Sequence, residues 1–157
     1  MSDQKRAILD KLQAGRAALE SALREVRGEA WETAVFSEDA AWTVSDILRH
    51  LVDAERSMTA LMARIRDGGE GAPADFNLDR WNAGRVAKAR DKTPAELLAA
   101  LAHNRGELLK FIDALAEADW GKQGRHGSLR IMTLAEICHT IADHESAHAA
   151  DIRRALG

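Results

Sequence analysis

The chain has 157 residues, a length that suits one domain with a substantial buried core. Its formal net charge of −3 argues against a nucleic-acid-binding protein, for which a basic patch is expected. The single cysteine excludes an intramolecular disulfide, and no apolar run is long enough to span a membrane. With a polar N-terminus that lacks the apolar part of a signal peptide, these features predict one cytoplasmic domain over residues 1–157. They predict neither a membrane nor a nucleic-acid partner.

Apolar residues at helical spacing predict a first long helix over residues 4–27, with one buried side. A second helix is predicted from Thr43, where Asp46 completes a capping box, to about residue 67. His50 lies about two turns inside this helix, near its apolar face. An unpaired polar ring at such a position is unfavourable, so His50 is expected to have a partner.

A shorter helix is predicted over residues 77–90, after a connection that contains glycine and proline. The clearest helix start follows it. Thr93 is an N-cap residue, Pro94 stands at the first helical position and Glu96 at the third, which predicts a helix to about residue 118.

Thr133 and Glu136 form another capping box and predict a last helix that runs to about residue 156. Its inward face begins with aliphatic residues and then carries two histidines; in order it contains Leu134, Ile137, Ile141, His144, His148, Ile152 and Ala155. No convincing alternating pattern of a β-strand is present. The sequence therefore predicts an all-α fold, a four-helix bundle with one short additional helix.

Two of the predicted helices bring histidines to the interior of the bundle. His144 and His148 are about 40° apart around the helix axis and one turn apart along it, so both rings can reach one metal ion. His50 is the candidate third ligand. Three protein ligands with open positions are typical of a catalytic site for a divalent ion such as zinc or nickel. The alternative is a pair of surface or hydrogen-bonded core histidines, but three buried rings without a metal would form an unfavourable polar cluster.

Residues 144–148 also match the H-E-x-x-H pattern of zinc metalloproteases. A short chain with no strand to hold an extended peptide argues against that function. Within this pattern Glu145 has three possible roles: a general base, a hydrogen-bond partner of a metal ligand, or a solvated charge. The solvated charge is the favoured interpretation.

The remaining candidates have weaker support. His139 is about 140° from His144 around the helix and is not expected to share the metal. His103 is expected to be exposed, and His126 is expected to be mobile in a glycine-rich loop. Cys138 is expected to be a small buried hydrophobic residue rather than a nucleophile.

Arg105 occupies a position where the pattern of its helix would place a hydrophobic residue. One interpretation, which is favoured, is that it pairs with an acid or extends to solvent. The other is that it binds the carboxylate of a substrate at the mouth of the bundle.

Three segments of the chain, residues 42–51, 93–98 and 133–152, resemble the DinB/YfiT-like superfamily of metal-dependent helical-bundle proteins. The features that carry the resemblance are Trp42 followed by His50, and the later pair His144 and His148. The resemblance implies a four-helix bundle that binds zinc or nickel through His50, His144 and His148. It also implies that the protein pairs as a homodimer.

Relatives in this superfamily include transferases and isomerases that use mycothiol, bacillithiol or glutathione, in which the metal activates the thiol as a thiolate. The resemblance therefore implies a metal-dependent thiol S-transferase that acts on a small-molecule substrate with a low-molecular-weight thiol. One alternative is a non-catalytic metal-binding protein with a stress-associated or interaction role. A metal-dependent hydrolase is a further alternative. DNA synthesis is not expected, although a polymerase shares the DinB name.

Overall fold

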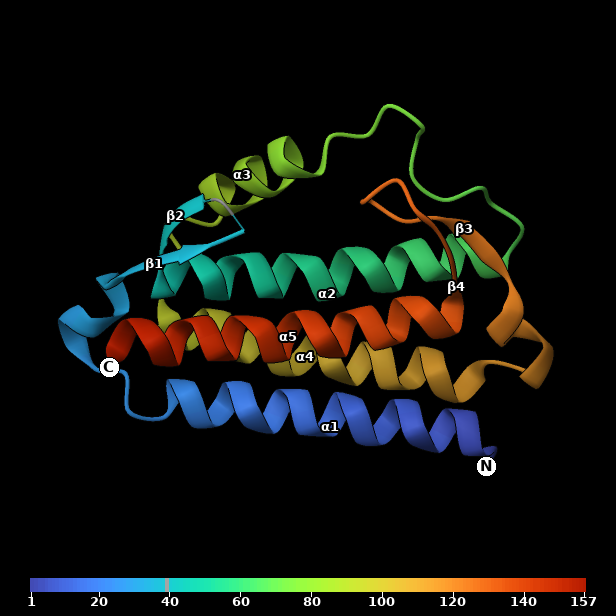
Figure 1. Cartoon of the computed structure of the whole chain (residues 1–157), viewed down its shortest axis with the longest axis horizontal. Helices are drawn as coiled ribbons and strands as arrows, with labels where there is room; N and C mark the ends of the chain where they lie inside the picture. The colour runs from blue at the N-terminus through green and yellow to red at the C-terminus, as the bar shows by residue number, and fades with distance from the viewer. Residues whose placement is uncertain (39) are drawn as a thin grey trace.

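The computed structural model describes residues 1–38 and 40–157. Four long helices lie side by side along the longest dimension of the molecule (Figure 1): α1 (Asp3–Leu23), α2 (Val44–Arg66), α4 (Pro94–Ala114) and α5 (Leu134–Leu156). One shorter helix, α3 (Leu78–Lys88), lies over α2 (Figure 1). The predicted all-α four-helix bundle with one short additional helix is confirmed.

The predicted capping boxes begin three of the long helices. The side chains of Thr43, Thr93 and Thr133 each accept the backbone N–H of an acidic residue three positions later, and each acid accepts the N–H of its threonine. These reciprocal bonds satisfy amides that have no partner inside the helix, so they fix where each helix starts.

The colour sequence in Figure 1 shows that α2 and α4 run in the same direction, while α1 and α5 run in the opposite one. Two neighbouring parallel helices need a connection that returns along the bundle. The segment 67–93, which includes α3, makes this return over one side of α2. That side of α2 is therefore covered by the segment 67–93 with the short helix α3, and not by another long helix.

Two short hairpins are present, although the sequence showed no convincing strand pattern. The first pairs β1 (Ala34–Ser37) with β2 (Ala40–Thr43), and the second pairs β3 (Gln123–Arg125) with β4 (Ile131–Thr133). Strands of three or four residues are too short to show an alternating pattern. Two 3₁₀ turns, Gly28–Glu32 and Glu117–Gly121, precede the hairpins.

Each hairpin leads directly into a long helix. The second strand of the first hairpin ends at Thr43, the N-cap of α2, and that of the second ends at Thr133, the N-cap of α5. Within residues 1–38 and 40–157, no helix combines the length and the apolar character that a membrane crossing requires.

The core consists of two apolar clusters, and each long helix contributes to both. One cluster is centred on residues such as Ile8, Leu61, Leu108 and Ile137. The other is centred on residues such as Leu19, Ile47, Leu101 and Ile152. Between the two clusters, each long helix contributes one charged residue to a network of ion pairs that joins all four helices.

These four charged residues, one from each long helix, are Arg16, Glu55, Arg105 and Glu145, and we call them the ionic layer. Arg16 Nη2 lies 3.2 Å from Glu55 Oε2 and 3.0 Å from Glu145 Oε2. Arg105 Nη2 lies 2.8 Å from Glu55 Oε1 and 3.3 Å from Glu145 Oε1. Both carboxylates are 3% exposed, so these charges depend on one another for their stability.

Replacement of Glu55 with alanine is expected to destabilise the fold strongly, because two largely buried guanidinium groups, each 11% exposed, then face one carboxylate. Removing one partner of a buried pair costs about 3–5 kcal/mol in the free energy of unfolding. Urea unfolding followed by circular dichroism measures the change. Glu107→Ala is the control: this exposed residue forms a surface ion pair with Lys110, and its loss is expected to have little effect. Equal stability of the two variants would contradict a structural role for the layer.

Candidate metal centre

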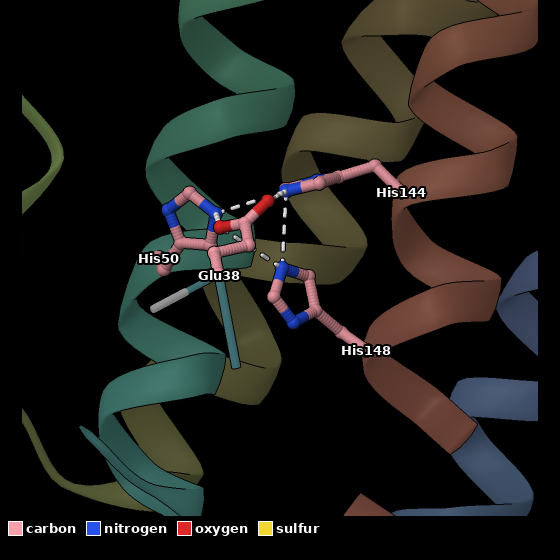
Figure 2. A group of neighbouring side chains, drawn as sticks. All are labelled: Glu38, His50, His144 and His148. Atoms are coloured by element: carbon pink, nitrogen blue, oxygen red, sulfur yellow. Dashed lines mark hydrogen bonds and ion pairs between the residues drawn. The ribbon is translucent and has the colours of Figure 1, made fainter. Parts of the chain in front are cut away.

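Two packed helices bring three histidine rings together (Figure 2). His50 projects from α2, and His144 and His148 project from successive turns of α5. The Nε2 atom of His144 lies 2.9 Å from that of His50 and 3.0 Å from that of His148. The predicted His50, His144 and His148 are therefore brought to one point. His50 and His148 are buried, whereas His144 is half-buried.

Glu38 completes this cluster from the turn of the first hairpin (Figure 2). Its carboxylate oxygens lie 3.1 Å from Nε2 of His50, 3.2 Å from that of His144 and 3.5 Å from that of His148. Contacts with His144, His148 and His50 hold the pKa of this carboxyl far below its usual range. Glu38 therefore adds a negative charge directly at the point where the three rings meet.

Sequence reasoning missed Glu38. A carboxylate in a loop has no periodic pattern that places it, and its position here depends on the pairing of β1 with β2. The backbone of Glu38 has φ 51°, an unusual value for a residue other than glycine. The only signal in the sequence is an acidic residue in the segment that precedes the N-cap of α2.

Contacts behind His148 fix the orientation and tautomer of its ring. Ser37 Oγ donates its hydrogen to Asp151 Oδ2. Toward His148 it therefore acts as an acceptor, and Nδ1 of His148 donates a hydrogen bond to Ser37 Oγ at 3.1 Å. With its hydrogen on Nδ1, the ring directs the lone pair of Nε2 into the cluster. A carboxylate or hydroxyl behind a histidine is the usual arrangement for a metal ligand.

The donor set suits a divalent ion. Three imidazole nitrogens and one carboxylate are ligands that zinc and nickel accept, and one ion requires its donor atoms about 3 Å apart. The four donor atoms all lie within 4.8 Å of one another. Nε2 of His144 contacts the nitrogens of two other rings, and its single possible hydrogen satisfies only one of them. A shared cation satisfies all three.

A pocket of about 420 Å³ opens onto this cluster. Glu38, His50 and His144 line one end of it, and the rest runs along α2 beneath α3 and the segments around residues 72–76 and 126–127. Most of its wall is apolar and includes Ala54, Met58, Leu61, Pro73, Phe76, Leu78 and Trp81. The histidine cluster is therefore accessible to a small molecule from the pocket.

The other candidate residues lie outside the cluster. His103 is exposed, as predicted, and the half-buried His139 is not among the four residues of the cluster. Cys138 is completely buried, and burial raises the pKa of its thiol to about 12. Such a thiol is protonated at neutral pH, in agreement with a role in packing.

Two predictions about polar residues were wrong. Glu145 was expected to be a solvated charge, but it is 3% exposed in the ionic layer, because the other helices supply Arg16 and Arg105 as partners. His126 was expected to be mobile, but it is 9% exposed and lines the pocket, because the second hairpin folds back over α2.

Arg105 pairs with Glu55 and Glu145 and also donates to the backbone oxygen of Leu12 at 3.1 Å. This agrees with the favoured interpretation, that it pairs with an acid. Its contact with a substrate carboxylate stays a prediction.

Residues 11–152 match the sequence model of the DinB superfamily. The chain belongs to the DinB superfamily. No functionally curated protein matches its sequence.

Three of the solved structures with a similar fold carry a functional description of their own. The mycothiol-dependent maleylpyruvate isomerase has a TM-score of 0.80 at 17% identity, over 97% of this chain and 63% of that one. YfiT from Bacillus subtilis, described as a probable metal-dependent hydrolase, has a TM-score of 0.75 at 20% identity, over 100% and 90%. The colibactin self-resistance protein ClbS, solved with double-stranded DNA, has a TM-score of 0.77 at 12% identity, over 96% and 94%. This DinB chain thus spans less than two thirds of the isomerase, and the likeness is one of fold.

The stability of the metal-free protein is expected to depend on pH through His144. Burial, followed by the charges of His148 and His50, lowers the pKa of His144 below its ordinary value of 6.5, although Glu38 opposes the shift. The unfolded chain then binds a proton at this ring more readily than the folded chain. The free energy of unfolding is therefore expected to fall as the pH decreases below 6.5.

Urea unfolding across roughly pH 5 to 8, after chelation, measures this dependence. His144→Gln is expected to flatten the profile, whereas His103→Ala, at an exposed histidine, is expected to preserve it. Identical profiles for the wild type and His144→Gln would show that His144 does not contribute.

Proposed function

We propose that the protein is a divalent-metal-dependent enzyme that joins a low-molecular-weight thiol to a small apolar electrophile. His50, His144 and His148 hold the ion, and Glu38 supplies a fourth donor or a nearby negative charge. The observation that carries the proposal is that Glu38, His50 and His144 line a pocket of about 420 Å³ and form one cluster of donor atoms with His148. The similarity in fold to a mycothiol-dependent isomerase supports the thiol as the co-substrate.

A divalent ion held by His50, His144 and His148 would lower the pKa of a thiol substrate and so favour its thiolate form at neutral pH. The contributions of the chain itself follow from its geometry. Ser37 and Asp151 hold the ring of His148 in the tautomer that presents Nε2. The carboxylate of Glu38, whose oxygens lie 3.1–3.5 Å from the three rings, would balance part of the charge of the ion. The apolar wall excludes water from the second substrate.

The metal content of protein purified without an affinity tag tests the site directly. About one zinc or nickel ion per chain is expected, because the cluster offers one set of donors. His50→Ala and His148→Ala are each expected to lose most of the metal, whereas His103→Ala, outside the cluster, is expected to retain it. Wild-type protein without stoichiometric metal, by elemental analysis, would refute the proposal.

Ser37→Ala is expected to weaken metal binding by about 10- to 100-fold, because His148 Nδ1 loses the acceptor that fixes its ring. Competition with a chromogenic chelator measures the affinity. Ser57→Ala is a matched control, since Ser57 lines the same pocket but contacts none of the histidines in the cluster. Equal affinities in the two variants would exclude this role for Ser37.

Turnover separates the proposed enzyme from its alternatives. Metal-loaded protein is incubated with several low-molecular-weight thiols and a chromogenic aryl halide, and thioether formation is followed by absorbance. Metal-dependent transfer with at least one thiol is expected, with its loss in His50→Ala. Hydrolysis of a chromogenic ester without any thiol would instead favour the hydrolase. Metal binding without turnover in either assay would favour a non-catalytic metal-binding protein.

A further inference from the structure

The half of the pocket away from the histidine cluster contains one buried polar ring, that of His126. It lies in the loop that joins β3 to β4, and its side chain is 9% exposed. Its Nε2 atom lies 3.4 Å from the sulfur of Met58, another residue of the pocket wall. His126 is thus placed to meet a molecule that occupies the pocket.

Local hydrogen bonds determine which nitrogen of His126 carries the hydrogen. The backbone N–H of Ser128 donates to Nδ1 at 3.1 Å, so Nδ1 is an acceptor and Nε2 carries the hydrogen. Burial, together with the charge of Arg130, lowers the pKa of this ring, which keeps it neutral at physiological pH. The Nε2 hydrogen faces only a thioether, a weak acceptor, and is therefore available to a ligand.

Charges give the pocket a direction. Glu38 places a carboxylate at the end of the pocket formed by the histidine cluster. Arg64, near the C-terminal end of α2, lines the opposite end. Within the described ranges 1–38 and 40–157, no ion pair joins the guanidinium of Arg64 to a carboxylate. The remaining carboxylate of the wall, that of Asp53, is already paired with Arg56 and Arg85. Arg64 therefore favours an anionic group of a ligand at its end of the pocket, and in the metal-free protein Glu38 disfavours such a group at the histidine cluster.

The helix sets the distance between the two ends. Met58 lies eight residues after His50 on α2, which corresponds to roughly 12 Å along the helix axis. The pocket wall as a whole is mainly apolar. A molecule that contacts both the cluster and His126 therefore needs an apolar body of about this length.

We infer that the substrate of this pocket is an elongated, mostly apolar carboxylic acid that is oriented by His126. Its carboxylate accepts the hydrogen bond of His126 Nε2 and lies toward Arg64, while its chain lies along α2 and its opposite end reaches the histidine cluster. The inference rests on the proposed function for the identity of the reacting end, but the recognition of the acid by His126 stands on the pocket alone. A buried carboxylate needs such a donor, because its burial without one is unfavourable.

Binding of decanoate and of 1-decanol, measured by isothermal titration calorimetry, tests the inference. A ten-carbon chain with bonds of about 1.5 Å extends roughly 12 Å, which matches the length of the pocket. The titrations use the protein as purified and the same protein after chelation of metal. The variants are His126→Ala, His126→Gln, which retains an N–H donor of similar reach, and the exposed control His103→Ala.

Decanoate is expected to bind the wild type and His103→Ala alike, and about tenfold more weakly to His126→Ala, because a hydrogen bond to a charged group is lost. His126→Gln is expected to recover part of the affinity, and 1-decanol is expected to bind all variants similarly. Three results would overturn the inference: no binding of decanoate to the wild type, an equal loss of acid and alcohol in His126→Ala, or loss of decanoate binding on chelation. If the proposed function is wrong, the metal analysis or the turnover assay shows it. The decanoate titrations of the protein after chelation do not depend on either result.

Discussion

The ionic layer is the constraint on which the rest of the structure depends. Two arginines and two glutamates from four helices meet in the interior, where each charge is stable only beside its partners. Apolar packing tolerates small shifts of one helix along another, but a shift that separates these charges leaves them buried without partners. The layer therefore fixes how far each helix is displaced along its neighbours.

This fixed register explains the geometry of the histidine cluster. Glu55 lies five residues after His50 on α2, and Glu145 directly follows His144 on α5. Arg16 and Arg105 each bind both glutamates and so fix α2 relative to α5. They thereby also set the position of the His50 ring relative to the His144 ring. A slide of one helix turn, about 5 Å, would move His50 away from His144 and His148. The buried charges thus hold the proposed ligands in place without touching them.

The sequence predicted what depends on one helix and missed what depends on several. The spacing of His144 and His148 follows from the helical repeat, and the three capping threonines mark helix starts through local bonds alone. Glu145 was predicted wrongly because its partners come from α1 and α4, and periodicity within α5 contains no information about them. Glu38 and His126 lie in the turns of short hairpins, whose positions depend on tertiary packing against α2 and α5.

The four donor atoms differ in how they are supported. Three belong to long helices that the whole core stabilises, whereas Glu38 belongs to an exposed turn between strands of four residues. Replacement of a helical histidine disturbs packed surroundings, but replacement of Glu38 alters a side chain that is nearly half exposed. The three histidines therefore form a part of the centre that is costly to change, whereas Glu38 can be replaced with little effect on the fold. Divergence within such a scaffold can change the chemistry of the cluster through the segment that carries Glu38, while the three helical histidines and the bundle around them are inherited intact.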